Sequence, residues 1–335
     1  MTENDIESRF MAAMEAFKKN NAEYTTRLAW IKDTKHTISN KLTGIKHLYT
    51  MLNDTRYVKD RIKGKVIMDA GCGAGTFSVL LGLLGAQKVY AVDYYTDCID
   101  STNFLAKSAN LDNIETIESD IGELKLPANS VDGIFSVEAI SHYRHYDAFL
   151  EIAGRITRKD GFLIIRDGNN GASPSVRRKN YRLWDVFENY PGAISLYGHS
   201  KGETCYLDQR KEIIREQFPE LSPEQVTEYA SFTFGYAKET IIEAVNQFMR
   251  NNFSQKSEFR RGVCPLDPIL DTYMEYLFNP KELKRELAQY GFKARVISSG
   301  PARSDLRWLQ AIWEWLSPIT IYSPRGFQIV ANKET

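Results

Sequence analysis

The chain has 335 residues, with 43 basic and 43 acidic side chains and a formal net charge of zero at pH 7. Its length allows one large or two modest domains with an ample core. The charge balance argues against nucleic acid as a partner, because binding phosphates requires an excess or a stripe of basic residues.

Three features of the sequence bear on its compartment. The N-terminal stretch MTENDIESRF is polar and acidic, unlike a signal peptide. The longest nearly apolar run, FSVLLGLLGA over 77–86, is too short to cross a membrane. The four cysteines have neither CxxC nor Cys/His spacing, so they are expected as free thiols. We expect a cytoplasmic protein without a transmembrane segment.

The first half of the chain changes its pattern near residue 62. Phe10, Met14 and Phe17 fall at helical spacing, which predicts an N-terminal helical cap over 1–62. Strand-like and helix-like segments then alternate over 63–167, with strands expected at 66–70, 88–93, 114–119, 131–137 and 161–167. Such alternation predicts a parallel sheet with right-handed crossovers.

The second half begins with a long segment, 168–278, that is mainly helical and rich in aromatic and charged residues. Ser222, Pro223 and Gln225 mark one helix start within it. A further helix starts at Asn279-Pro280 and stops at Gly291. Strands at 292–297 and 327–331 flank an aromatic helix near 308–316. We therefore predict a large insertion over 168–278 and a completion of the α/β core over 279–335.

The most specific signal is VIMDAGCGAGTFS, in which a buried strand ends at Asp69 and three glycines turn into a helix. Glycines let a backbone approach a ligand and adopt positive φ. The next two strands end at Asp93 and Asp120, so three acids line the edge where open α/β sheets bind ligands. A dinucleotide site would have glycine where Thr76 stands. An acid before the loop also suits a cationic ligand better than a pyrophosphate.

These residues resemble the class I S-adenosylmethionine-dependent methyltransferases, whose DxGxGxG motif matches at Asp69, Gly71, Gly73 and Gly75. The resemblance covers residues 64–167 well and the last two strands more loosely. It implies a Rossmann-like, doubly wound, seven-stranded sheet with an antiparallel last strand, here with the N-terminal helical cap and a large helical lid insertion.

The resemblance also implies how S-adenosylmethionine is held. The loop from Asp69 to Gly75, including Cys72, would hold the methionine part, and Asp93 the ribose. Asp120 and the Ile121 backbone would hold the adenine. Tyr94 and Glu138, which follow the second and fourth strands, complete the predicted cofactor site.

The segment SVEAISHYRHYD follows the fourth strand, which in the family is the junction of cofactor and substrate. Histidine titrates near neutral pH, so His142 is the first candidate for a general base and His145 the second. Packing or bonding to a backbone carbonyl is the competing role for His142. Tyr143 is expected to line an aromatic wall.

Metal-assisted transfer is an alternative, since Glu138, Asp167, Asn169 and Asn170 offer oxygen ligands at neighbouring strand ends. A glycine separates Asp167 from Asn169, a departure from the adjacent Asp-Asn pattern, so no metal is expected. Substrate-binding residues are instead expected at the mouth and in the lid. These are Tyr143, Asp167, Asn169, His199 and Tyr206.

Two further stretches are candidates for contact surfaces. The basic cluster SVRRKNYR over 175–182 could bind an anionic substrate group, but a solvated helix face is favoured. The tryptophan-rich run over 307–322 could lie at a membrane surface, but packing into the core is favoured.

The sequence thus predicts an enzyme that O-methylates a hydroxyl of a small metabolite or a glycan sugar and releases S-adenosylhomocysteine. N-methylation of a small amine is one alternative, because a neutral amine needs no strong base. A non-catalytic cofactor-binding subunit is the other. A homodimer is left open.

Overall fold

The computed structural model describes residues 2–19, 41–190, 204–250, 256–298, 312, 315–323 and 326–334. The chain forms two compact units. Unit 1 comprises Met1–Ile140, His145–Asn170 and Asn279–Thr335, and unit 2 comprises Ser141–Arg144 and Gly171–Phe278. Unit 2 thus contains most of the predicted insertion together with the short segment that carries His142. Whether it acts as a lid stays a prediction.

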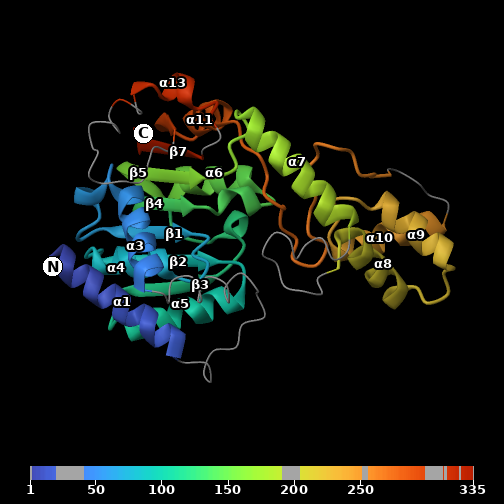
Figure 1. The fold of residues 1–335 in the computed structure, drawn as a ribbon, viewed down its shortest axis with the longest axis horizontal. Coiled ribbons are helices and arrows are strands. Elements are labelled where there is room, and N and C mark those ends of the chain that lie inside the picture. The colour runs from blue at the N-terminus through green and yellow to red at the C-terminus, as the bar shows by residue number, and fades with distance from the viewer. Residues whose placement is uncertain are drawn as a thin grey trace. The chain divides into compact units, whose positions relative to one another are not determined.

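Unit 1 is built on one seven-stranded sheet of order β3-β2-β1-β4-β5-β7-β6 (Figure 1). Strands β1 to β5 run parallel, and β7 pairs antiparallel with both β5 and β6. This confirms the predicted fold class. The strands are β1 (Val66–Ala70), β2 (Lys88–Asp93), β3 (Ile114–Glu118), β4 (Val131–Val137), β5 (Thr157–Asp167), β6 (Phe292–Ser298) and β7 (Phe327–Lys333).

Four strand boundaries differ from the prediction. Strands β6 and β7 end one and two residues later than expected, at Ser298 and Lys333. Strand β5 begins at Thr157 rather than at 161, because Thr157 pairs with Val131 before the register shifts. Strand β3 ends at Glu118, and Asp120 instead caps the short 3-10 helix η2 (Ile121–Glu123), where its side chain accepts a hydrogen bond from the Gly122 amide. A short polar side chain that satisfies its own backbone ends a strand early.

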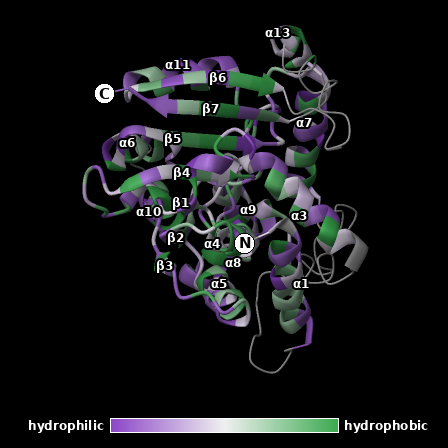
Figure 2. Ribbon diagram, turned by 90° about the vertical axis from the view of Figure 1, so that its left-hand side faces the viewer, coloured by the Kyte–Doolittle hydropathy of each residue, from purple (hydrophilic) through white to green (hydrophobic). Residues whose placement is uncertain are grey.

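Central strands are hydrophobic on both faces because helices cover both sides of the sheet. Ile134 and Phe135 of β4 and Ile164 of β5 are fully buried. Figure 2 shows such hydrophobic stretches as green segments of the strands. The helices of unit 1 are α1 (Glu3–Lys19), α3 (Lys41–Thr55), α4 (Thr76–Leu83), α5 (Thr96–Ser108), α6 (Tyr146–Ile156), α11 (Pro280–Gln289) and α13 (Ser317–Thr320), with η1 at Lys59–Arg61.

The N-terminal helices belong to this core. Phe10, Met14 and Phe17 of α1 are fully buried in the cluster that includes residues of α4 and α5. Their spacing in the sequence therefore correctly predicted the buried face of a helix. Helix α3 packs on both α1 and α4.

Unit 2 contains the helices α7 (Pro174–Asn189), α8 (Tyr206–Gln217), α9 (Pro223–Phe232) and α10 (Lys238–Met249). Helix η3 (Ile140–His142) runs from unit 1 into unit 2. The predicted capping box at the start of α9 is confirmed: Ser222 and Gln225 exchange side-chain and backbone hydrogen bonds. On α7, Arg178 and Arg182 are exposed, as expected for a solvated basic face.

The core-packing prediction for 307–322 is wrong for two of its described residues. Trp315 is 79% exposed and Ile319 is 71% exposed, whereas Ile321 is buried. The predicted helix at 308–316 lies mostly outside the described residues, and α13 begins only at Ser317. Among the residues that the structure describes, no helix is both long enough and apolar enough to cross a membrane.

A buried ion pair stabilises the centre of unit 2. Arg210 of α8 and Glu188 of α7 are both almost completely buried and form two hydrogen bonds with each other. The Arg210 Nε also donates to the Ala230 carbonyl of α9 at 2.9 Å. The guanidinium therefore joins three helices, and removing it would leave a carboxylate buried without its partner.

We expect Arg210→Met to lower the free energy of unfolding by about 3–5 kcal/mol, because the Glu188 carboxylate would then be buried without a positively charged partner. Urea unfolding followed by tryptophan fluorescence measures this. Lys211→Met is the matched control, since the neighbouring pair of Lys211 and Asp208 is partly exposed and contributes about 1 kcal/mol or less. Equal losses in the two variants would contradict the account.

Candidate functional site

The glycine loop after β1 has the backbone that its sequence predicts. Gly71, Gly73 and Gly75 have φ values of 74°, 54° and 85°, in the region that favours glycine. A Cβ on Gly75 would lie 2.6 Å from the Thr102 Cα, so this position has no space for a side chain. The Gly71 and Cys72 amides both donate to the Val92 carbonyl at 2.9 Å. The loop is thus held tightly against the end of β2.

Asp93 at the end of β2 fixes the same loop through its side chain. Its Oδ2 accepts from the Gly73 amide at 2.9 Å, and its Oδ1 accepts from the Tyr95 amide at 3.1 Å. Burial raises the pKa of Asp93, while these backbone bonds lower it. Each oxygen has a further lone pair, which a ribose hydroxyl can occupy. The side chain therefore fits the role that the resemblance implies.

Asp69, the acid near the end of β1, contacts helix α4 through its side chain. The side chain is buried, and its Oδ2 accepts a hydrogen bond of 2.6 Å from the Ser78 hydroxyl of α4. Burial raises its pKa to about 7. The predicted contact of Asp69 with the cofactor stays a prediction. The hydrogen bond between Asp69 and Ser78 connects β1 to α4.

The remaining predicted cofactor residues surround the loop. The Cys72 thiol is buried 3.4 Å from the Thr102 hydroxyl, and burial raises its pKa, so it is a packing group. All four cysteines are free and buried. Tyr94 is half exposed with its ring 5.2 Å from that of Tyr95, and Ile121 is buried at the start of η2. Their contacts with a cofactor stay predictions.

Glu138 follows β4 in a left-handed conformation, with φ at 51°. Its carboxylate is 48% exposed and accepts from Arg166 Nη1 at 2.6 Å and from the Gly168 amide at 2.9 Å. Arg166, near the end of β5, also lies 3.4 Å from a carboxylate oxygen of Asp54 in α3. Burial raises the pKa of Asp54 to about 6.

Three side chains that lie near Glu138 or the glycine loop were not predicted from the sequence. These are His47 and Asp54 of α3 and Arg166 of β5. The His47 Nε2 lies 3.3 Å from the hydroxyl of Thr76, the first residue of α4. Two signals were available. Arg166 is a charge inside the apolar run FLIIRD, and His47 and Asp54 are seven residues apart, which places them on one helix face.

The predicted bases lie in different units. His142 belongs to unit 2, is 42% exposed, and has Nδ1 3.0 Å from the Tyr273 carbonyl and Nε2 4.0 Å from Glu275 Oε1. His145 belongs to unit 1, is exposed, and caps the start of α6. A contact between His142 and a backbone carbonyl is what the competing, structural role of this residue predicted. The same contact also determines which nitrogen of the His142 ring carries the proton.

The predicted substrate residues are spread over both units. Asp167 is buried and accepts from the Asn169 amide at 2.7 Å, which closes a turn after β5. Tyr206 is buried, with its ring 5.9 Å from that of Phe187, so it packs in the core of unit 2. Tyr143 is half-buried. His199 lies outside the described residues. The roles of these side chains in substrate binding stay predictions.

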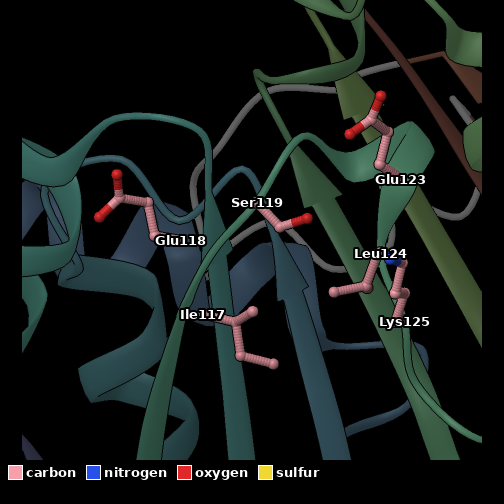
Figure 3. Close-up of a pocket in the computed structure, with 6 residues that line it drawn as sticks. All are labelled: Ile117, Glu118, Ser119, Glu123, Leu124 and Lys125. Atoms are coloured by element: carbon pink, nitrogen blue, oxygen red, sulfur yellow. The ribbon is translucent and has the colours of Figure 1, made fainter.

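A cavity of about 310 Å³ opens beside the end of β3 (Figure 3). Its lining residues are Ile117, Glu118, Ser119, Glu123, Leu124 and Lys125. None of them belongs to the predicted cofactor set, but Ser119 and Glu123 flank Asp120 and Ile121 in the sequence, and Glu118 is the β3 partner of Asp93. Within the described ranges, no group of three or more His, Cys, Asp or Glu side chains is placed to hold a metal ion.

Comparison with known proteins identifies the domain. Residues 62–218 match the family model of a methyltransferase domain. Residues 62–218 therefore form a region of the S-adenosylmethionine-dependent methyltransferase family. The matched residues contain the glycine loop, the three acids Asp69, Asp93 and Asp120, and the segment with His142 and His145.

Individual methyltransferases match over shorter stretches. The fatty-acid O-methyltransferase of Mycolicibacterium smegmatis is 27% identical over 107 residues, which are 32% of this chain and 38% of that protein. The protein arginine N-methyltransferase 1 of Chlamydomonas reinhardtii is 27% identical over 118 residues, 35% of this chain and 32% of that protein. The chain therefore matches less than two fifths of the length of these relatives.

Among solved structures, a SAM-dependent methyltransferase from Aquifex aeolicus aligns with 84% of this chain and 89% of its own, with 15% identity and a TM-score of 0.41. The strand order itself establishes the methyltransferase fold of unit 1.

The buried Asp69 of this methyltransferase domain predicts a pH-dependent stability. Its pKa rises from 3.8 to about 7 on folding, so at intermediate pH the folded chain holds a proton that the unfolded chain has lost. This stabilisation is complete below pH about 4 and is lost as the pH rises through about 7. Asp69→Asn should flatten the pH dependence of the free energy of unfolding by up to about 4 kcal/mol, at about 1.4 kcal/mol for each unit of the shift.

Urea unfolding of wild type and Asp69→Asn at several pH values between about 4.5 and 8 measures the effect. Asp100→Asn, which changes an exposed carboxylate on α5, is the control. Parallel pH curves for wild type and Asp69→Asn would contradict the protonation of Asp69 in the folded chain.

Proposed function

We propose that the protein transfers the methyl group of S-adenosylmethionine to a hydroxyl oxygen of a small metabolite or a glycan sugar. The observation that carries the proposal is the shared geometry of the glycine loop and Asp93. The loop backbone is left-handed at three glycines, and its centre is fixed by the Asp93 carboxylate through the Gly73 amide. The family match over 62–218 supports this use of the loop.

Several side chains of unit 1 fit the parts of the cofactor. The loop from Gly71 to Gly75 lets a ligand approach the backbone closely, and Asp93 offers carboxylate lone pairs to the ribose. Tyr94 offers an exposed aromatic face, and the Asp120–Ile121 turn offers polar groups to the adenine. When bound, S-adenosylmethionine supplies a methyl group on a sulfonium, which an in-line nucleophile can attack.

His142 is the proposed general base. The Tyr273 carbonyl can only accept a hydrogen bond, so the His142 Nδ1 that contacts it carries the proton. The His142 Nε2 is then the basic nitrogen. In the proposed step the acceptor oxygen bonds to the methyl carbon while the bond from that carbon to sulfur breaks. The hydroxyl proton moves to Nε2, where Glu275 at 4.0 Å can stabilise the imidazolium. The approach of His142 to the cofactor is part of the proposal.

N-methylation of a small amine is the second candidate. The relatives include both an O-methyltransferase and arginine N-methyltransferases. The exposed carboxylate of Glu138 at the end of β4 is a group that an amine could meet. A non-catalytic cofactor-binding role is the third reading. A cytoplasmic setting, a small-molecule acceptor and a homodimer also remain proposals.

The test is methyl transfer from labelled S-adenosylmethionine to panels of hydroxylated and amine acceptors by wild type and His142→Ala. With a hydroxyl acceptor, His142→Ala should lower kcat about 100-fold or more, because a positioned base contributes that much. The dissociation constant of the cofactor should be unchanged. His145→Ala serves as the comparison and should have a smaller effect.

Transfer to amines alone, at a rate that His142→Ala leaves intact, would overturn the O-methylation proposal in favour of N-methylation. Cofactor binding without transfer to either panel would favour the non-catalytic role.

A further inference from the structure

Helix α3 lies along the edge of the sheet at which β1, β4 and β5 end. Near its C-terminal end, the Asp54 carbonyl accepts from Gln328 Nε2 of β7 at 3.0 Å, and the Asp54 carboxylate faces Arg166. Two turns earlier, the His47 Nε2 lies 3.3 Å from the Thr76 hydroxyl. The helix therefore reaches from β7 to the residue that directly follows the glycine loop, all within unit 1.

His47 is surrounded by few charges. Arg166 of β5 is the charged group that acts on it, and the Thr76 hydroxyl faces it from α4. Burial first, and Arg166 second, lower the pKa of His47, so the side chain is neutral in the free protein at pH 7. The nearby carboxylates of Asp54 and Glu138 are directed at Arg166 instead. The imidazole therefore has no anionic partner among these groups.

We propose that His47 takes up a proton when S-adenosylmethionine or S-adenosylhomocysteine binds, and that its imidazolium pairs with the carboxylate of the ligand's amino-acid part. This inference rests on the proposed function, because it needs the amino-acid part to lie at the glycine loop beside Thr76. It adds a proton-linked contact from α3, outside the loop and the strand ends.

The sign of the linkage follows from the charges. A carboxylate beside His47 favours the imidazolium, so the complex holds a proton that the free protein lacks at neutral pH. Binding that takes up protons weakens as the pH rises. Affinity for either ligand should therefore fall between about pH 6 and pH 9, and the part of that fall due to His47 should depend on the ligand's carboxylate.

The experiment compares two ligands that share the adenosine part. S-adenosylhomocysteine carries the amino-acid group, and 5′-methylthioadenosine lacks it. Calorimetric titrations at pH 7.5 in phosphate and in Tris give the protons taken up from the difference in apparent enthalpy. The variants are His47→Gln, which keeps a polar partner for Thr76, and Lys46→Gln, an exposed neighbour on α3 that serves as the control.

We expect wild type and Lys46→Gln to take up protons with S-adenosylhomocysteine and not with 5′-methylthioadenosine. His47→Gln should abolish the uptake, weaken S-adenosylhomocysteine about tenfold at pH 7 and leave 5′-methylthioadenosine unaffected. Asp93 faces the ribose that both ligands share, so its contribution cancels between the ligands. Any contribution of Asp69 is common to wild type and His47→Gln, so it cancels between these two proteins.

Unchanged proton uptake in His47→Gln, or an equal loss of affinity for both ligands, would overturn the inference while leaving the proposed function intact. Failure of both ligands to bind wild type would instead contradict the proposed function itself.

Discussion

The bond between the Gly73 amide and the Asp93 carboxylate is the interaction on which the rest of the site depends. It joins the loop after β1 to the end of β2, so the two neighbouring strand ends form one edge, which is the proposed cofactor site. The loop can come this close because Gly75 carries no Cβ where Thr102 packs. Ser78 and the buried Asp69 hold the helix that follows, so the loop rests on a rigid base.

The other side of that edge is organised by Arg166. This guanidinium connects the N-terminal helix α3, through Asp54, with the end of β4, through Glu138. It therefore helps to fix Glu138 in a left-handed conformation that costs free energy for a residue other than glycine. Helix α3 is consequently part of this edge of the sheet as well as of the core.

Much of this could be predicted from the sequence, for identifiable reasons. Alternating apolar strands and the DAGCGAG turn carry local signals, so the sheet, its antiparallel last strand and the loop were predicted correctly. Asp69 was interpreted from its motif position, and only the structure shows its burial against Ser78. The contact of His47 with Thr76 joins residues distant in the sequence, and neither residue type alone indicates it. Trp315 belongs to an aromatic run for which core packing was favoured, and only the structure shows that this side chain is exposed.

The most direct test of the account is calorimetric titration of S-adenosylhomocysteine into wild type and Asp93→Asn. The account predicts micromolar binding to wild type and a loss of about tenfold or more in the variant, because a charged hydrogen-bond acceptor for the ribose is removed. An equal free energy of unfolding for wild type and Asp93→Asn would show that the loss of affinity comes from the binding site and not from a destabilised fold. Absence of binding to wild type, or equal binding to both, would contradict the assignment of this edge as the cofactor site.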